Sequence, residues 1–173
     1  MHIFLTGDIQ VGKTTVIRNF LSRSGLSADG FMTYWESDSD GRRSLYLAPY
    51  NSDLRADKKY LIARDGSQRL LRAEDMKSVF DIHGVEMLNN SGTCNVTVMD
   101  ELGFLESEAY AFQNAVFERI AGDAPILGVI RSRQTAFLDA LRSHPDVETR
   151  DVTAENRDAV LNWLLSKRER SLL

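Results

Sequence analysis

The sequence predicts an α/β fold: a mostly parallel β-sheet with helices on both faces and an insertion of antiparallel hairpins at about residues 30–72. Strand-like and helical segments alternate at both ends of the chain, as in parallel sheets joined by right-handed crossovers. Between these ends, polar and apolar residues alternate on either side of turn residues, which is typical of hairpins. The length of 173 residues favours a single domain spanning residues 1–173.

An apolar strand-like segment at residues 2–6 opens the chain, and a glycine-containing turn follows it. The next apolar residues recur at helical spacing and predict a helix at about residues 13–23. These residues are Val16, Ile17, Phe20 and Leu21. Strand, turn and helix in this order are the beginning of an α/β unit.

Residues 30–72 predict two hairpins. In the first, residues 31–36 alternate in polarity, residues 38–41 supply a turn and residues 44–48 return. The second, with weaker support, joins residues 60–63 to residues 69–71. We expect Tyr34 and Trp35 to pack within the first hairpin. The basic residues of this region fit either a lid that faces phosphate or a solvated charged face: Arg42, Arg43, Lys58, Lys59, Arg64, Arg69 and Arg72.

From residue 94 onward, strands and helices alternate regularly. We expect strands at residues 95–99, 125–130 and 147–152, the last of them at an edge of the sheet. The continuous apolar run at residues 125–130 is typical of a parallel strand that is buried on both faces. Helical spacing predicts a helix at about residues 106–121, a short helix around Phe137 and a final helix around Leu161.

Composition and charge argue against several function classes. The chain has 21 basic and 25 acidic residues, and this net charge of −4 argues against a broad surface for duplex nucleic acid. The longest apolar run, residues 124–130, is far shorter than the roughly 20 residues of a membrane span. No signal-peptide pattern follows Met1, and the single cysteine, Cys94, fits a reducing compartment. We therefore expect a cytoplasmic protein without nucleic-acid or membrane partners.

Residues 7–14, GDIQVGKT, match the phosphate-loop pattern G-x-x-x-x-G-K-[ST] at every defined position. In this pattern the glycines let backbone amides approach phosphate oxygens, the lysine binds the β- and γ-phosphates, and the hydroxyl can ligate Mg²⁺. The match lies between a predicted strand and a predicted helix, so a chance occurrence in an ordinary turn is the weaker interpretation. We expect the nucleotide to contact Gly7, Asp8, Ile9, Gln10, Val11, Gly12, Lys13, Thr14 and Thr15.

Two carboxylates, Asp100 and Glu101, follow the expected strand at residues 95–99. In phosphate-loop proteins an acidic residue at the end of a neighbouring strand helps to hold Mg²⁺. Adjacent strand residues point to opposite sides, so the two carboxylates can have different roles. We expect Asp100 to hold the metal together with Thr14, and Glu101 to act as the general base on the attacking water. The alternative is an ordinary acidic strand end or helix cap.

Two further positions border the expected ligand crevice. Arg131 follows the strand at residues 125–130, where it can neutralise charge on the γ-phosphate or belong to a solvated basic loop with Arg133. Asn156 lies in the loop after the last expected strand, and we expect it to contact the base of the nucleotide. The alternative is that this loop only caps the final helix, through Thr153.

Together these stretches resemble the small P-loop nucleoside-triphosphatase family, also called nucleotide phosphatases. The matching pieces are residues 7–15, 29–33, 41–43, 99–103, 137–139 and 152–157. The resemblance implies a RecA-like parallel sheet with a hairpin insertion, and Mg²⁺-dependent hydrolysis of ATP, GTP and other nucleoside triphosphates to the diphosphate and phosphate. Two stretches depart from the family pattern. Ile9 and Gln10 stand where the family usually has Pro and Gly. The stretch at residues 78–92 is shorter and more polar than the corresponding stretch of the family pattern.

The first interpretation is therefore a nucleoside-triphosphatase with Lys13, Glu101 and Arg131 as catalytic residues. Two other functions stay open: a small phosphotransferase whose hairpin arginines hold a second substrate, and a switch protein whose hydrolysis acts as a timer. The base preference is not determined, because the sequence has no Asn-Lys-x-Asp guanine motif. The oligomeric state is also left open.

Overall fold

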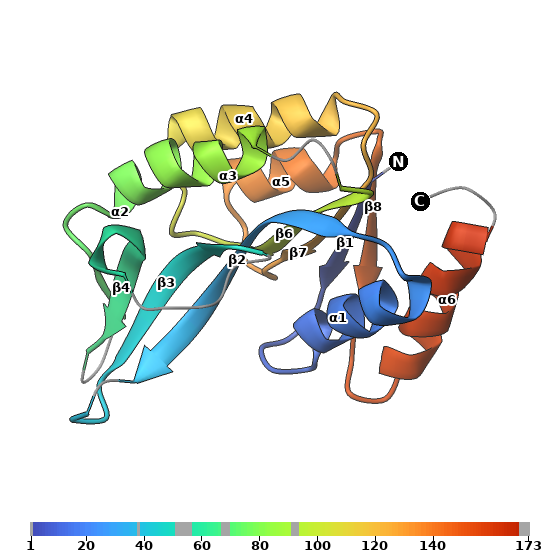
Figure 1. The fold of residues 1–173 in the computed structure, drawn as a ribbon, viewed down its shortest axis with the longest axis horizontal. Helices are drawn as coiled ribbons and strands as arrows, with labels where there is room; N and C mark the ends of the chain where they lie inside the picture. The colour runs from blue at the N-terminus through green and yellow to red at the C-terminus, as the bar shows by residue number, and fades with distance from the viewer. Residues whose placement is uncertain (1, 38, 51–56, 67–69, 91–93, 170–173) are drawn as a thin grey trace.

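The computed structural model describes residues 2–37, 39–50, 57–66, 70–90 and 94–169. Its strands are β1 (His2–Thr6), β2 (Ala28–Ser37), β3 (Arg43–Pro49), β4 (Leu61–Asp65), β5 (Leu70–Arg72), β6 (Val96–Leu102), β7 (Ile126–Ile130) and β8 (Val147–Asp151). Within the described residues they form one sheet of eight strands in the order β5-β4-β3-β2-β6-β7-β1-β8 (Figure 1). The sheet is the frame on which the candidate site is built.

One side of this sheet is parallel and the other is antiparallel. β2, β6, β7, β1 and β8 pair in parallel, whereas β2 to β5 pair successively in antiparallel hairpins. The predicted RecA-like sheet and its hairpin insertion are thus confirmed. β2 belongs to both parts, so the inserted hairpins continue the sheet instead of forming a separate unit.

Helices cover both faces of the sheet, as expected. On one face lie α1 (Lys13–Ser24) and α6 (Arg157–Glu169), and on the other lie α2 (Met76–Ser78), a π-helical segment η2 (Val79–Gly84), α3 (Val85–Asn89), α4 (Tyr110–Ile120) and α5 (Ala136–Arg142) (Figure 1). A short 3₁₀ turn, η1 (Lys58–Tyr60), precedes β4. None of the helices in the described ranges is long and apolar enough to cross a membrane.

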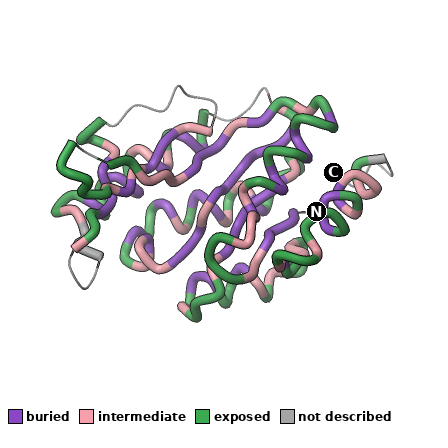
Figure 2. The backbone as a smooth tube through the Cα atoms, turned by 90° about the horizontal axis from the view of Figure 1, so that it is seen from below, coloured by how far each residue is buried: buried purple, intermediate pink, exposed green. Residues whose placement is uncertain are grey.

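Each face of the sheet has its own apolar core. Ile17 and Phe20 of α1 pack with strand residues on one face, and Phe31 and Phe112 meet with ring centroids 5.3 Å apart on the other. Every residue of β7 is buried, as the continuous apolar run predicted. Seen from a perpendicular direction, buried residues run through the interior of the molecule, and exposed residues lie on the outer turns of the helices and in the loops (Figure 2).

The helical segment at residues 76–89 was not predicted. Its buried residues are Met76, Val79, Phe80, Met87 and Leu88, and they cover the sheet on the face of α4. These positions recur three, four, eleven and twelve residues after Met76, so the sequence does carry a helical signal here, although polar residues interrupt it and the middle part is π-helical. The stretch that departs from the family pattern is therefore a helical layer.

Two predicted boundaries near the carboxylates were wrong. β6 continues through Asp100 and Glu101 to Leu102, and α4 begins at Tyr110 instead of residue 106. The intervening turn is closed by Gln113, whose side-chain amide donates to the carbonyls of Glu106 and Ser107 at 2.8 and 3.0 Å. These bonds hold the turn apart from the regular helix.

Candidate active site

The phosphate loop joins β1 to α1 and has left-handed backbone at Gly7 (φ 122°), Gln10 (φ 64°) and Gly12 (φ 98°). A side chain in this conformation costs about 1 kcal/mol. Gln10 is one of the two residues that depart from the family pattern, and it stands where the family usually has glycine. The loop thus keeps a left-handed turn without glycine at this position.

Both ends of the loop are packed against the chain that follows β8. A Cβ atom at Gly7 would lie 2.2 Å from the Val152 carbonyl oxygen, and one at Gly12 would lie 2.8 Å from Cδ of Arg157. A side chain at Gly7 would therefore collide with backbone. Val152 after β8 and Arg157 at the start of α6 thus support the loop, and the sequence pattern alone did not reveal these contacts.

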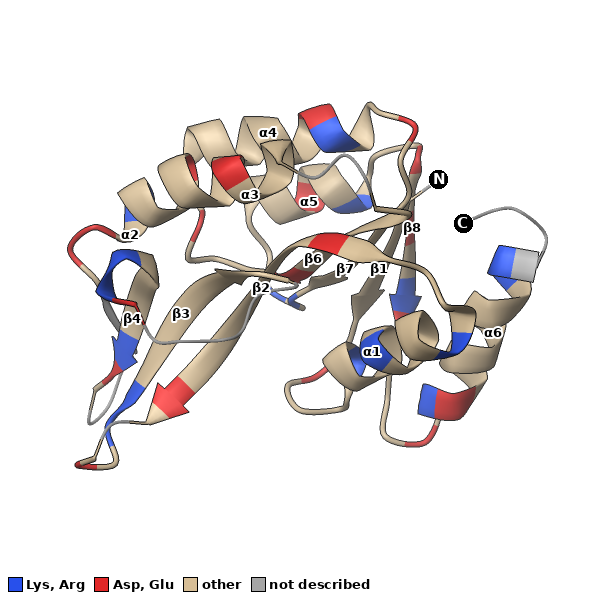
Figure 3. Cartoon of the chain, in the orientation of Figure 1, with Lys and Arg blue, Asp and Glu red and all other residues tan. Residues whose placement is uncertain are grey.

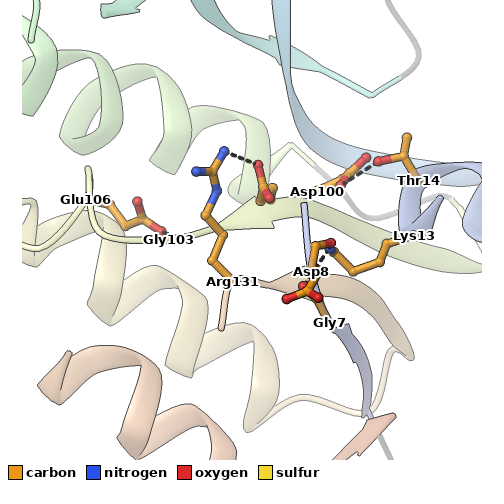
Figure 4. A network of polar contacts seen from close by, with 9 residues as sticks. Gly7, Asp8, Lys13, Thr14, Asp100, Gly103, Glu106 and Arg131 are labelled. Atoms are coloured by element: carbon orange, nitrogen blue, oxygen red, sulfur yellow. Dashed lines mark hydrogen bonds and ion pairs between the residues drawn. The ribbon is translucent and has the colours of Figure 1, made fainter. Parts of the chain in front are cut away.

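Lys13 is almost buried, with 7% of its surface exposed, and its side chain turns back into the loop. Its Nζ donates to the carbonyls of Gly7 at 2.9 Å and Asp8 at 2.6 Å (Figure 4). Burial lowers the pKa of Lys13, and the negative charge of Glu101 opposes this shift. Gly12, the N-cap residue before α1, supplies no side-chain cap, and the first turn of α1 contains no acidic residue. Its first amides and the positive end of its dipole therefore suit an anion.

Asp100 meets Thr14 across the edge of the sheet. The Thr14 hydroxyl donates to Oδ1 of Asp100 at 3.2 Å, and Asp100 is 3% exposed (Figure 4). Burial raises the pKa of Asp100 to about 6, although the hydrogen bond from Thr14 acts in the opposite direction. A hydroxyl and a carboxylate side by side are hard oxygen ligands of the kind that Mg²⁺ binds. The pair predicted to hold the metal is thus brought together.

Glu101, the carboxylate that follows Asp100 in β6, is bound by Arg131. Nη2 of Arg131 donates to Oε2 of Glu101 at 2.8 Å, with 28% and 24% of the two side chains exposed. The register between β6 and β7 shifts between Asp100 and Leu102, which places Glu101 at an irregularity of the ladder. Both carboxylates line the same cleft, so their separate roles stay a prediction, and the direct bond between Glu101 and Arg131 was not predicted.

These residues line one cleft of about 360 Å³, which we call the phosphate-loop cleft. Its walls contain Ile9, Gln10, Gly12, Lys13, Thr14, Thr15, Thr33, Trp35, Arg43, Asp100, Glu101, Val129 and Arg131. An adjoining hollow of about 230 Å³ is lined by Gly7, Asp8, Ile9, Lys13, Glu101, Arg131, Ser132 and Arg133. Val11 instead packs against the core beside α1.

Asn156 is engaged in its own loop. Its side-chain carbonyl accepts from the Thr153 amide at 2.8 Å, and its Nδ2 donates to the Asp151 carbonyl at 3.1 Å. The Thr153 hydroxyl accepts from the Asn156 amide at 3.3 Å, which is the geometry of the capping alternative. Contact between Asn156 and the base stays a prediction.

Glu106 is a buried carboxyl beside the cleft, and sequence analysis missed it. It is 2% exposed, and its Oε1 accepts a short hydrogen bond from the Gly103 amide (Figure 4). Burial raises the pKa of Glu106 to about 7 from an ordinary 4.5. The sequence offers no signal for this position, because a glutamate near a predicted helix start reads as an exposed residue.

We expect Glu106 to make folding stability depend on pH. The unfolded chain releases this proton near pH 4.5 and the folded chain near pH 7, so stability falls as the pH rises between these values. At about 1.4 kcal/mol per pKa unit, the loss is on the order of 3 kcal/mol. Urea unfolding at several pH values should show the wild type losing stability relative to Glu106→Gln, with exposed Glu118→Gln as control. If the difference in unfolding free energy between the wild type and Glu106→Gln stays constant from pH 4.5 to 7, the prediction is wrong.

Comparisons with known proteins show which family the chain belongs to. A family model described as NTPase matches residues 2–165. The nucleoside-triphosphatase THEP1 of Natranaerobius thermophilus is 27% identical over 99% of this chain and 98% of its own length. The human cancer-related nucleoside-triphosphatase is 30% identical over 92% of each chain. The crystal structure of THEP1 from the hyperthermophile Aquifex aeolicus shares the fold, with a TM-score of 0.65 and 22% identity over 96% of this chain and 98% of that one. As the sequence resemblance predicted, the chain belongs to the NTPase family.

Proposed function

We propose that this chain hydrolyses nucleoside triphosphates to the diphosphate and phosphate, with Mg²⁺ held by Thr14 and Asp100. One observation carries the proposal: a single cleft contains the phosphate-loop lysine, the Thr14–Asp100 pair and the Glu101–Arg131 pair. The names of the curated relatives support hydrolysis as the reaction. The single cysteine fits a reducing compartment, so we place the activity in the cytoplasm.

The phosphate loop and Lys13 bind the triphosphate. The amides at the start of α1 face the phosphate oxygens, and the Lys13 ammonium moves from loop carbonyls to the β- and γ-phosphates. The Thr14 hydroxyl and the Asp100 carboxylate supply hard oxygen ligands at the same end of the cleft. Mg²⁺ bound there would neutralise charge on the β- and γ-phosphates. Among the described residues no cluster of three or more His, Cys, Asp or Glu surrounds the site, and Mg²⁺ commonly takes its other ligands from phosphates and water.

Glu101 is the group that accepts a proton from water. As the water oxygen attacks the γ-phosphorus, the bond from that phosphorus to the β-phosphate oxygen breaks, and one water proton passes to the Glu101 carboxylate. Arg131 holds one oxygen of this carboxylate at 2.8 Å and thereby orients it. The guanidinium also lies at the end of β7, where it can face the charge that develops on the transferred phosphoryl group.

Phosphate release from a triphosphate and Mg²⁺ alone tests this function. ATP, GTP, CTP and UTP are each incubated with the protein, and inorganic phosphate is measured with and without EDTA. We expect phosphate from more than one nucleotide, and none when EDTA removes the metal. Release that requires an added acceptor would identify a phosphotransferase. Very slow release, together with a protein partner bound in only one nucleotide state, would identify a switch.

A further inference from the structure

The antiparallel ribbon formed by β2 and β3 makes one wall of the phosphate-loop cleft. Thr33 and Trp35 of β2 and Arg43 of β3 line the cleft together with Lys13 and Asp100. The sequence analysis had expected Trp35 to pack within the hairpin and had left Arg43 between a lid and a solvated face. In the structure Trp35 does pack against the core that includes Leu45 of the hairpin, and both Trp35 and Arg43 also line the cleft.

The ribbon reaches the cleft because β2 continues beyond its parallel neighbour. The pairing of β2 with β6 ends at Met32 opposite Asp100, and among the described residues 33–37 pair only with β3. Alternate side chains share a face, so Phe31, Thr33 and Trp35 lie on one side of the ribbon. Phe31 is fully buried and anchors this face, while the next two side chains reach the cleft. Beyond the helix layers the ribbon carries charged residues of both signs (Figure 3).

Two contacts orient the guanidinium of Arg43. Its Cζ lies 4.7 Å from the centroid of the Trp35 ring, and its Nη1 lies 4.0 Å from Oδ2 of Asp65. The ion pair joins side chains that are 49% and 46% exposed, and pairs of this kind add little stability. Stacking on an indole ring leaves the N–H groups at the edge of a guanidinium directed outward. Arg43 is therefore positioned, yet able to exchange its carboxylate partner for another anion.

The charges of the cleft favour such an anion. The lining has three basic and two acidic side chains: Lys13, Arg43, Arg131, Asp100 and Glu101. Glu101 is already bonded to Arg131 at 2.8 Å, and the charge of Asp100 offsets that of Lys13. Among the side chains that line the cleft, Arg43 thus supplies the positive charge in excess, and its exposed partner Asp65 lies outside the lining. A triphosphate remains negatively charged even with a divalent cation bound.

The order of the strands indicates which phosphate Arg43 faces. β2 lies on the far side of β6 from β1 and its loop, so Arg43 is beyond Asp100 and Glu101. In the proposed function these carboxylates would lie beside the terminal phosphate, because Asp100 would help to hold the metal that neutralises its charge and Glu101 would accept the proton of the attacking water. The opposite side of the loop, at Gly12, is covered by Arg157.

We propose that Arg43, stacked on Trp35, binds the terminal phosphate of the nucleotide and makes the site prefer triphosphates over diphosphates. This inference rests on the proposed function and adds the residue that recognises the end of the substrate. The planar guanidinium offers two parallel N–H groups to phosphate oxygens, a geometry that an ammonium cannot match.

Nucleotide affinity tests the inference, with Arg43→Gln as the variant and Arg42→Gln as the matched control on the same hairpin. Dissociation constants are measured for a non-hydrolysable triphosphate analogue and for the diphosphate, both with Mg²⁺. Losing a charge-assisted hydrogen bond should weaken triphosphate binding by about 10- to 100-fold in Arg43→Gln. We expect diphosphate binding to stay within about twofold, and Arg43→Lys to recover only part of the loss.

The outcomes separate this inference from the proposed function. If the wild type releases phosphate from triphosphates while Arg43→Gln still binds the triphosphate analogue more tightly than the diphosphate, this inference is wrong. The proposed hydrolysis is then unaffected. An equal loss of triphosphate and diphosphate affinity would also overturn it, because Arg43 would then act through general charge or folding. A wild type that bound neither nucleotide would overturn both.

Fluorescence of Trp35 provides a second measurement. The chain has two tryptophans, so Trp163→Phe leaves Trp35 as the single reporter. Trp163 lies on α6, where its ring contacts Arg150 and Lys167, and it does not line the cleft. We expect the triphosphate analogue to change the Trp35 emission in the Trp163→Phe chain, and the change to vanish when Arg43→Gln is added. If the Trp35 emission does not change when the triphosphate analogue binds, the result contradicts the proposed arrangement of Arg43 stacked on Trp35.

Discussion

Lys13→Ala is expected to weaken triphosphate binding by roughly 100- to 1,000-fold. Lys13 is 7% exposed and is the cation that projects into the phosphate loop, where its Nζ already lies on two carbonyl groups. Removing one partner of a buried charge contact costs about 2–5 kcal/mol, and each 1.4 kcal/mol is a factor of about ten in affinity. Titration with a non-hydrolysable triphosphate measures the effect directly.

The control for this variant is Arg23→Ala, which removes a positive charge from the exposed last turn of the same helix. We expect Arg23→Ala to bind like the wild type, since its charge is screened by solvent far from the loop. Thermal unfolding of both variants distinguishes lost binding from lost folding. Wild-type affinity in a folded Lys13→Ala chain would show that residues 7–14 are not a phosphate site.

Glu101→Gln is expected to lower hydrolysis by roughly 10²- to 10⁴-fold while nucleotide affinity stays nearly constant. Glutamine keeps the size of the side chain and an oxygen that can accept from Arg131, so the 2.8 Å contact can persist. The amide cannot take a proton from water, so only the chemical step is affected. Single-turnover phosphate release, with binding measured separately, isolates this step.

Asp100→Asn should give the opposite pattern, because Asp100 bonds to Thr14 and belongs to the predicted metal site. We expect this variant to lose the Mg²⁺-dependent part of nucleotide binding. Exposed Glu118→Gln on α4 controls for the loss of one negative charge.

Near-normal turnover in Glu101→Gln would exclude Glu101 as the base, and Arg131 or assistance by the substrate would then be tested.

Local patterns predicted much of the fold and the centre of the site. The motif at residues 7–14 predicted a phosphate loop between a strand and a helix, because its glycines and lysine serve one local purpose. The apolar run of β7 predicted a strand buried on both faces. The helical layer at residues 76–89 was not predicted, although its buried residues recur at helical spacing, because polar residues interrupt the pattern.

Contacts between distant residues could not be derived from these patterns. Arg131 is 30 residues from Glu101 and bonds to it because parallel neighbours β6 and β7 end side by side. In the sequence Glu106 looked like an ordinary exposed glutamate. In the structure it is buried in the turn after β6, where its carboxylate accepts a hydrogen bond from the Gly103 amide. Trp35 was expected to pack within the hairpin, and Arg43 had two plausible environments; the extension of β2 past β6 brings both side chains to the cleft.

The sequence by itself determined the chemical groups of this protein: a phosphate loop, two adjacent carboxylates, and an arginine after a buried strand. These features are local, since backbone geometry and the spacing of a few residues are enough to define them. The tertiary structure decided which groups meet, because strand order and register place residues far apart in the chain at one edge of the sheet. It also decided how far each group is removed from water, and burial in turn raises the pKa of both Asp100 and Glu106.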